Sequence, residues 1–179
     1  AIEAISAHAL SRPILVDATA ADTASALELA LARGWDVVLA NKVPLAADRA
    51  SAERLHRVAR EHGRRVLHEA TVGAGLPVID TLRKLIEAGD RVLRIEGCPS
   101  GTLGFLFGEL GRGRSFSAAL RSAVAAGYTE PDPRVDLSGL DVARKSLILG
   151  RIIGFAGDLD DVRVESLVPA ALRDVSRDE

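Results

Sequence analysis

The chain of 179 residues is 47% apolar, so it is long enough and apolar enough to bury a core of its own. Its 23 Lys and Arg residues against 25 Asp and Glu residues give a net charge of −2, which argues against nucleic-acid or anionic-membrane binding and favours small solutes as partners. The single cysteine, Cys98, cannot form an internal disulfide, and no apolar run approaches the ~18 residues of a membrane span, so we expect a cytoplasmic protein.

The first part of the chain alternates between strand and helix patterns. The predicted elements, strand first, are residues 14–20, 23–33, 35–42, 47–63 and 64–70. Asp22 is the expected cap of the first helix, and Gly34 is the expected left-handed stop after it. This order predicts an α/β layer with parallel strands, in which ligands bind outside the carboxyl ends of the strands. Those ends are Thr19, Asn41 with Lys42, and Glu69.

After residue 70 the rhythm changes. The pattern predicts a helix, a strand, and then three more helices, at residues 76–90, 91–98, 100–110, 115–127 and 140–155. Ser115 is the expected cap of the helix that follows it. We therefore predict two domains, at residues 1–69 and 70–179.

The stretch GAGLPV, residues 73–78, follows a predicted strand and opens a predicted helix, as a dinucleotide-binding fingerprint does. Its sixth position is Val78 rather than glycine, which weakens that interpretation. A plain glycine turn and a turn whose carbonyl oxygens face a cation are the alternatives.

The segment GYTEPDPRVDLSGLDVARK, residues 127–145, contains the most chemistry. Asp141 and Lys145 are four residues apart and share one face of a predicted helix, while Glu130 and Asp136 precede them. A lysine held near carboxylates can give a proton to a carbonyl oxygen as hydride reaches the carbon, although an ordinary surface ion pair is the alternative. Lys42 could reach into a crevice, or could be a solvated lysine at a strand end.

The histidines and the cysteine show no site of their own. His8, His56, His62 and His68 lack metal-ligand spacing, and Cys98 has no evident base beside it. All five are interpreted as structural.

Four motifs together resemble the homoserine dehydrogenase family, particularly the dehydrogenase portion fused to aspartate kinase in some bacteria. They are LANKVPLA, HEATVGAGLPVIDTLRKLIEAGD, IEGCPSGTLGFLFGEL and GYTEPDPRVDLSGLDVARK, and the match runs from about residue 14 to about residue 154. The resemblance implies NADH- or NADPH-dependent reduction of L-aspartate 4-semialdehyde to L-homoserine, in threonine and methionine biosynthesis. It also implies the latter part of a Rossmann-like NAD(P)-binding domain, followed by an α+β catalytic and dimerisation domain of a homodimer or higher homo-oligomer.

The resemblance also assigns roles, residue by residue. Lys145 matches the family's proton donor, and Lys42 matches a lysine between nicotinamide and substrate. The positions that match substrate-binding or substrate-lining residues are Glu130, Asp136, Asp141, Gly101 and Thr102. Thr19 and Gly127 match cofactor contacts. The backbone carbonyls that match a monovalent cation site, for Na⁺ or K⁺, are those of Glu69, Val72, Ala74 and Leu76.

Two departures from the family pattern stand out. Val135 replaces the first Asp of the PDPRDDL that similar sequences often carry, which predicts weaker support for the site. The family's opening strand with its G-x-G-x-x-G turn and its last helices have no counterpart here, and the chain has no methionine. We therefore expect a middle fragment, incomplete at both ends, that binds cofactor poorly by itself.

Two other functions stay open. One is a non-catalytic, dehydrogenase-like scaffold for dimerisation or regulation, in which residues 91–98 serve as an interface strand under either interpretation. The other is a different NAD(P)-linked enzyme acting on a related aldehyde, although a semialdehyde dehydrogenase that forms an acyl phosphate needs a nucleophilic cysteine, and Cys98 is a poor candidate.

Overall fold

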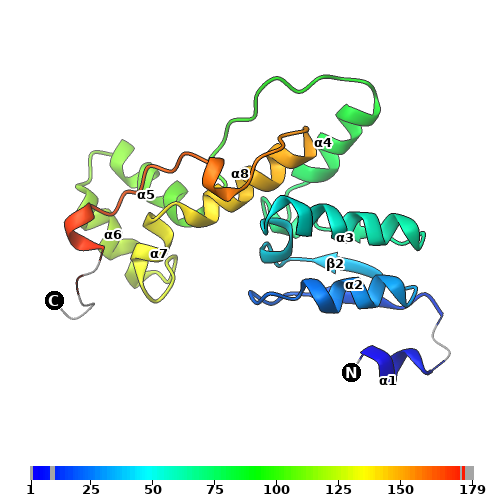
Figure 1. Cartoon of the computed structure of the whole chain (residues 1–179). Coiled ribbons are helices and arrows are strands. Elements are labelled where there is room, and N and C mark those ends of the chain that lie inside the picture. Colours follow the sequence, from blue (N-terminus) through cyan, green and yellow to red (C-terminus); the bar gives the residue numbers. More distant parts are fainter. Residues whose placement is uncertain (1, 9–10, 174, 176–179) are drawn as a thin grey trace. The chain divides into compact units, whose positions relative to one another are not determined.

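The computed structural model describes residues 2–8, 11–173 and 175. These residues form two compact units: residues 1–92 with 145–162, and residues 93–144 with 163–179. The chain leaves the first unit after the fourth helix and returns to it within the eighth (Figure 1). Within the described part of the chain, no helix combines the length and the apolar character needed to cross a membrane.

The first unit contains a parallel three-stranded sheet, which confirms the predicted α/β layer. The strands are β1 (Ile14–Asp17), β2 (Asp36–Leu39) and β3 (Val66–Leu67), in the order β1-β2-β3. Leu15 pairs with Val37, and Val38 pairs with Leu67. Each strand is shorter than its sequence pattern predicts, because the polar residues at the carboxyl end bond through their side chains instead of extending the ladder.

The helices of the first unit bury their apolar faces on one core. They are α1 (Ile2–Ser6), α2 (Ala24–Ala32), α3 (Arg49–Glu61), α4 (Val78–Glu87) and the later part of α8 (Leu140–Ile152), with the 3-10 turns η1 (Val43–Leu45), η2 (Glu69–Thr71) and η3 (Leu159–Asp161). In α2 the buried residues are Leu27, Ala30 and Leu31, which recur at helical spacing. They share the core with Leu55 of α3 and Ile148 of α8.

The two ends of α2 test the predicted N-cap and the predicted glycine stop. Gly34 has a φ of +85° just after the helix, as predicted. The predicted cap, Asp22, is off by one position, since the N-cap residue is Thr23. The Thr23 side chain does not cap the helix but donates to Asp17, while Asp22 accepts from the backbone N–H of Ala24.

The second unit is helical. It contains α5 (Gly101–Gly111), α6 (Phe116–Ala125), α7 (Pro133–Leu137), the start of α8 and the 3-10 turn η4 (Ala170–Leu172). Its core is small, and the buried members are Leu106, Ala119, Ala123, Leu137 and Val168. Ser115 caps α6 as predicted, because its hydroxyl accepts from the backbone N–H of Ala118.

The predicted strand at residues 91–98 is wrong. All eight residues are described, and they have no regular secondary structure; Figure 1 draws them as part of the irregular segment between α4 and α5. Leu93 is 83% exposed, so the alternating pattern has no partner strand to bury its apolar face. An alternating sequence needs such a partner before it can form a ladder.

Candidate active site

A hydrogen-bond network closes the carboxyl end of β1 and β2. Asp17, the last residue of β1, is 5% exposed. Its Oδ1 accepts from the backbone N–H of Thr19 at 2.9 Å and from the Thr19 hydroxyl at 2.8 Å. Its Oδ2 accepts from the Thr23 hydroxyl at 2.6 Å and from the Asn41 amide at 3.0 Å. The carboxylate therefore joins the ends of two strands and the start of α2.

Asp17 stays charged at this edge. Burial alone favours the neutral acid, but the hydrogen bonds from Thr23, Thr19 and Asn41 outweigh it and hold the pKa of the carboxyl below its ordinary value. The network fixes Thr19, the predicted cofactor contact, because both its backbone N–H and its hydroxyl donate to Asp17. The Thr19 hydroxyl oxygen also accepts from the Asn41 amide at 3.3 Å and from the backbone N–H of Ala21 at 3.4 Å, so the backbone carbonyl is what this residue can still offer a ligand.

Asn41 connects this network to the main chain on either side of Lys42. Its buried amide also donates to the carbonyl of Ala21 at 2.8 Å, and its Oδ1 accepts from the backbone N–H of Val43 at 2.9 Å. Lys42 is the next residue and the N-cap of η1, and its carbonyl accepts from the backbone N–H of Leu45 at 3.1 Å. The main chain at Lys42 is thus held on both sides. Sequence reasoning named Lys42 and missed Asp17 and Asn41 as its supports.

The turn after β3 carries the predicted cation ligands. Gly73 and Ala74 both have positive φ values, +84° and +53°, which bend residues 69–76 back on themselves. The Glu69 carboxylate accepts from the backbone N–H groups of Ile79 and Asp80, both at 2.8 Å, and so caps the start of α4. Its side chain is therefore committed to the helix. Of the predicted ligand carbonyls, that of Glu69 accepts from the backbone N–H of Val72 at 3.3 Å and that of Leu76 from the backbone N–H of Val78 at 2.8 Å.

The residue before this turn, His68, is buried and neutral. Its Nε2 lies 2.7 Å from Nη2 of Arg83, which donates to it, and the Thr71 hydroxyl donates to its carbonyl at 2.6 Å. Burial first, and then the positive charge of Arg83, lower the pKa of His68 to about 3. We therefore interpret His68 as a structural residue, because its side chain links η2 to α4.

In the second unit, the carboxylate of one predicted substrate residue, Asp136, contacts two others, Thr102 and Glu130. Asp136 Oδ1 lies 2.9 Å from the buried Thr102 hydroxyl, and its Oδ2 accepts from the backbone N–H of Glu130 at 2.8 Å. The Thr102 hydroxyl also lies 2.6 Å from the Tyr128 carbonyl. Asp136 thus fixes the backbone that presents Glu130, whose own side chain is exposed.

Two glycines of this unit have structural positions. Gly101 is the first residue of α5, directly after the cap Ser100. Gly127 has a φ of +71° just past α6, and its N–H donates to the carbonyl of Val124. A left-handed residue there favours glycine whether or not a cofactor touches it.

The segment with the two prolines, Pro131 and Pro133, is partly helical. Pro133 begins α7, and Asp132 caps it by accepting from the backbone N–H of Arg134 at 2.9 Å. Proline at a first helical position after an aspartate cap is a common way to start a helix. Val135 lies on this short helix and is 56% exposed.

Helix α8 carries Asp141 in its first turn and Lys145 one turn later. The four-residue spacing places both on one face of the helix, as predicted. Asp141 belongs to the second unit, together with Gly101, Thr102, Gly127, Glu130 and Asp136, whereas Lys145 belongs to the first unit, together with Thr19 and Lys42. The structure thus describes the predicted site as two sets of residues, each within its own unit.

Over the described ranges, no cluster of three or more His, Cys, Asp and Glu side chains is arranged to hold a metal ion. Cys98 is exposed, and its thiol lies 3.8 Å from the Ser100 carbonyl.

Comparison with protein families matches both parts of the chain. The model for the homoserine dehydrogenase NAD-binding domain matches residues 1–69, and the model for homoserine dehydrogenase matches residues 77–179. The chain belongs to the homoserine dehydrogenase family. The compact units divide the chain elsewhere, so the predicted boundary between residues 69 and 70 stays a proposal.

Curated relatives and solved structures of this family align with most of the chain. The bifunctional aspartokinase/homoserine dehydrogenase 1 of Arabidopsis thaliana is 47% identical over 93% of the chain, which spans 18% of that protein. The homoserine dehydrogenase of Emericella nidulans is 46% identical over 93% of the chain, which spans 47% of it. A hyperthermophilic archaeal homoserine dehydrogenase in complex with NADPH is 31% identical, with a TM-score of 0.69, over 78% of this chain and 43% of that one.

Proposed function

We propose that the full-length protein reduces L-aspartate 4-semialdehyde to L-homoserine with NADH or NADPH, within threonine and methionine biosynthesis. The chain spans less than half of the length of the relatives described above, so this activity is proposed for the whole protein. The observation that carries the proposal is the Asp136 network, in which one carboxylate contacts the Thr102 hydroxyl and accepts from the backbone N–H of Glu130.

The proposed roles follow from charge and position. The carboxylates of Glu130 and Asp141 bind the substrate ammonium, and Asp136 orients Glu130 through its backbone N–H. Lys145 holds a proton at Nζ and gives it to the aldehyde oxygen as the carbonyl is reduced. Thr102 and Gly101 are the further residues proposed to contact the substrate. In this arrangement the positive charge of Lys145 stabilises the negative charge that develops on the aldehyde oxygen, and the carboxylates hold the positively charged ammonium of the substrate.

A nicotinamide cofactor fits the carboxyl edge of the sheet. Parallel strands bind nucleotides outside this edge, and the Asp17 network pre-orders Thr19 and Lys42 there. When bound, the cofactor supplies the hydride. Thr19 and Gly127 would contact the cofactor, and Lys42 would lie between the nicotinamide and the substrate.

A monovalent cation, Na⁺ or K⁺, fits the turn at residues 69–76. The proposed ligands are the carbonyl oxygens of Glu69, Val72, Ala74 and Leu76. Neutral oxygen donors suit a hard cation, and the Glu69 carboxylate is already engaged by α4. The cation's role in this proposal is to fix the turn.

We further propose that the protein acts in the cytoplasm as a homodimer or higher homo-oligomer, through the segment at residues 91–98. Leu93 and Ile95 are exposed there, and a second copy would bury them. The molar mass of the full-length protein, measured by light scattering before and after Leu93→Asp, tests this pairing.

The deciding experiment is homoserine oxidation followed as NAD(P)H absorbance. Full-length protein should turn over, and Lys145→Ala should lose roughly two to four orders of magnitude in kcat. Lys84→Ala is the matched control, because Lys84 pairs only with Asp80 on the exposed face of α4 among the described residues. A folded protein that binds the nucleotide but never reduces it would favour the scaffold function instead.

A further inference from the structure

One arginine near the end of α8 holds the backbone that follows Lys42. Nη1 of Arg151 donates to the carbonyls of Leu45 and Ala47, both at 2.8 Å. Leu45 is the last residue of η1, and Ala47 comes directly before the N-cap of α3. These two bonds therefore join α8 to the short connection between Lys42 and α3.

The second terminal nitrogen of Arg151 is held as well. Nη2 donates to the Asp158 carboxylate at 2.8 Å and to the Gly157 carbonyl at 3.3 Å. The same carboxylate oxygen accepts from the backbone N–H of Arg49, the first residue of α3, at 2.6 Å. The Arg151 side chain is only 14% exposed, so water would replace these bonds poorly if the side chain were lost.

Apolar packing supports the same contact between α8 and η1. Leu45, Ile148 and Leu149 are buried members of one core in the first unit. Lys145, Ile148 and Arg151 recur at every third position of α8 and belong to the same unit. Because a helix rises about 1.5 Å per residue, Arg151 lies about 9 Å along the helix axis from Lys145. The position of Arg151 therefore sets the position of Lys145's backbone.

The link from Arg151 to Lys42 is equally short. The Lys42 carbonyl accepts from the backbone N–H groups of Leu45 and Ala46, at 3.1 Å and 2.9 Å, which closes η1. Arg151 then binds the carbonyl of Leu45 at the other end of this turn. One buried guanidinium thus connects to Lys42 through a single turn and to Lys145 through a helix.

We propose that Arg151 is a positioning residue for the dehydrogenase reaction, and that it fixes the backbone of Lys42 relative to the helix that bears Lys145. The inference rests on the proposed function, in which both lysines act at the reacting centre. Arginine suits this task because its planar set of donors binds several acceptors at once, whereas a lysine ammonium acts as a point charge. Misplacement of a catalytic group by about 1 Å can slow a reaction by about 100-fold.

The test is Arg151→Met in the full-length protein, assayed by homoserine oxidation well below its melting temperature. Methionine keeps a long unbranched stem but donates no hydrogen bond. We expect kcat to fall by roughly ten- to a hundredfold. The KM for homoserine should change by less than about threefold, because Glu130 and Asp141, the carboxylates proposed to bind it, belong to the second unit, whereas every contact of Arg151 described above lies in the first.

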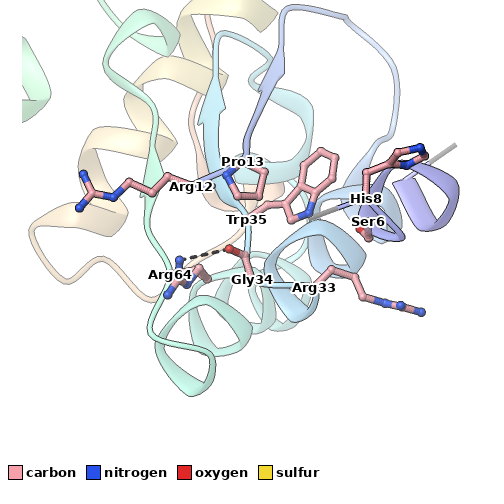
Figure 2. A pocket seen from close by; sticks show the side chains of 8 residues that line it. All are labelled: Ser6, His8, Arg12, Pro13, Arg33, Gly34, Trp35 and Arg64. Atoms are coloured by element: carbon pink, nitrogen blue, oxygen red, sulfur yellow. Dashed lines mark hydrogen bonds between the residues drawn. The ribbon is translucent and has the colours of Figure 1, made fainter. Parts of the chain in front are cut away.

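Arg64→Met is the matched control. Arg64 also donates to two backbone carbonyls of the first unit, those of Gly34 at 3.1 Å and His62 at 3.3 Å. Figure 2 shows the bond to Gly34, which precedes β2 and therefore lies at the opposite end of that strand from Asn41. This variant should also lower the melting temperature, but kcat should stay within about twofold of the natural value. An equal loss of kcat in Arg64→Met, or an unchanged kcat in Arg151→Met, would overturn the proposal.

Amide hydrogen exchange separates this proposal from the proposed function. Exchange at the N–H groups of Leu45 and Ala46 should become faster in Arg151→Met and stay unchanged in Arg64→Met, because these groups close the turn that Arg151 holds. Unchanged exchange in Arg151→Met would refute the contact itself, whatever the activity. A natural protein that oxidises no homoserine but shows the faster exchange in Arg151→Met would instead refute the proposed function, and would reduce Arg151 to a structural role.

Discussion

The two units organise their polar side chains by different means. In the first unit, Asp17 and Asn41 come from neighbouring parallel strands, and the ladder that pairs those strands also sets the spacing between the two side chains. In the second unit, Asp136 joins a short helix, a loop and the first turn of α5, with no sheet behind it. A site built on strand ends inherits the rigidity of the core, whereas a site built on loops depends on its own hydrogen bonds.

The two units also differ in how many large apolar side chains they bury. The core of the first unit includes fully buried Leu27, Leu31, Val37 and Leu39. The second unit buries fewer large side chains in its core and leaves Leu93 largely exposed. Loss of a network bond should therefore change global stability most in the first unit and substrate binding most in the second. The next three predictions test that contrast, from the largest effect to the smallest.

Asn41→Ala should destabilise the protein by about 2–4 kcal/mol, because it removes four donor contacts of a buried amide and leaves the Asp17 carboxylate with fewer donors. Urea unfolding monitored by circular dichroism measures the change. Thr23→Val, which removes the 2.6 Å bond to Asp17 and the longer 3.3 Å contact with Asn41, is the graded control and should cost about half as much. An Asn41→Ala protein as stable as the natural one would show that the strand ends are not anchored by this network.

Thr102→Val should mainly change substrate binding. It removes the hydroxyl that contacts Asp136 and the Tyr128 carbonyl, so the loop that presents Glu130 loses one of its supports. One hydrogen bond of about 1–1.5 kcal/mol predicts a rise in the KM for homoserine of roughly tenfold, with the KM for the cofactor unchanged. Thr102→Ser, which keeps the hydroxyl, should restore the natural value. Equal rises in both constants would indicate general loosening of the unit rather than a substrate-side effect.

The two networks also show which features could be predicted from the sequence and which could not. The strand–helix alternation predicted the parallel sheet, because buried strands and amphipathic helices have distinct periods. The resemblance placed Asp136 among the substrate-binding residues; its carboxylate accepts from the backbone N–H of Glu130, and its role toward the substrate stays a prediction. Asp17 and Thr23 were not singled out as partners, because their bond depends on where the turn after β1 places them. Residues 91–98 carry an alternating pattern, but a pattern alone cannot supply the neighbouring strand that a ladder requires.

The smallest expected effect concerns pH and His68, the residue directly before the turn at residues 69–76. In the folded protein the pKa of His68 is about 3, below its ordinary value of 6.5, so between those values the unfolded chain binds a proton that the folded protein does not. The stability contribution is complete above pH 6.5 and is lost as the pH falls toward 3, with a slope of at most about 1.4 kcal/mol per pH unit. His56, whose pKa burial also lowers, adds to the same slope. His68→Gln keeps an acceptor for Arg83 but cannot titrate, so melting temperatures measured from pH 7 to pH 6, over which the contribution of His68 changes by less than about 1 kcal/mol, should fall less steeply in the variant. An unchanged slope would mean that His68 is protonated in the folded protein and that its contact with Arg83 does not persist in solution.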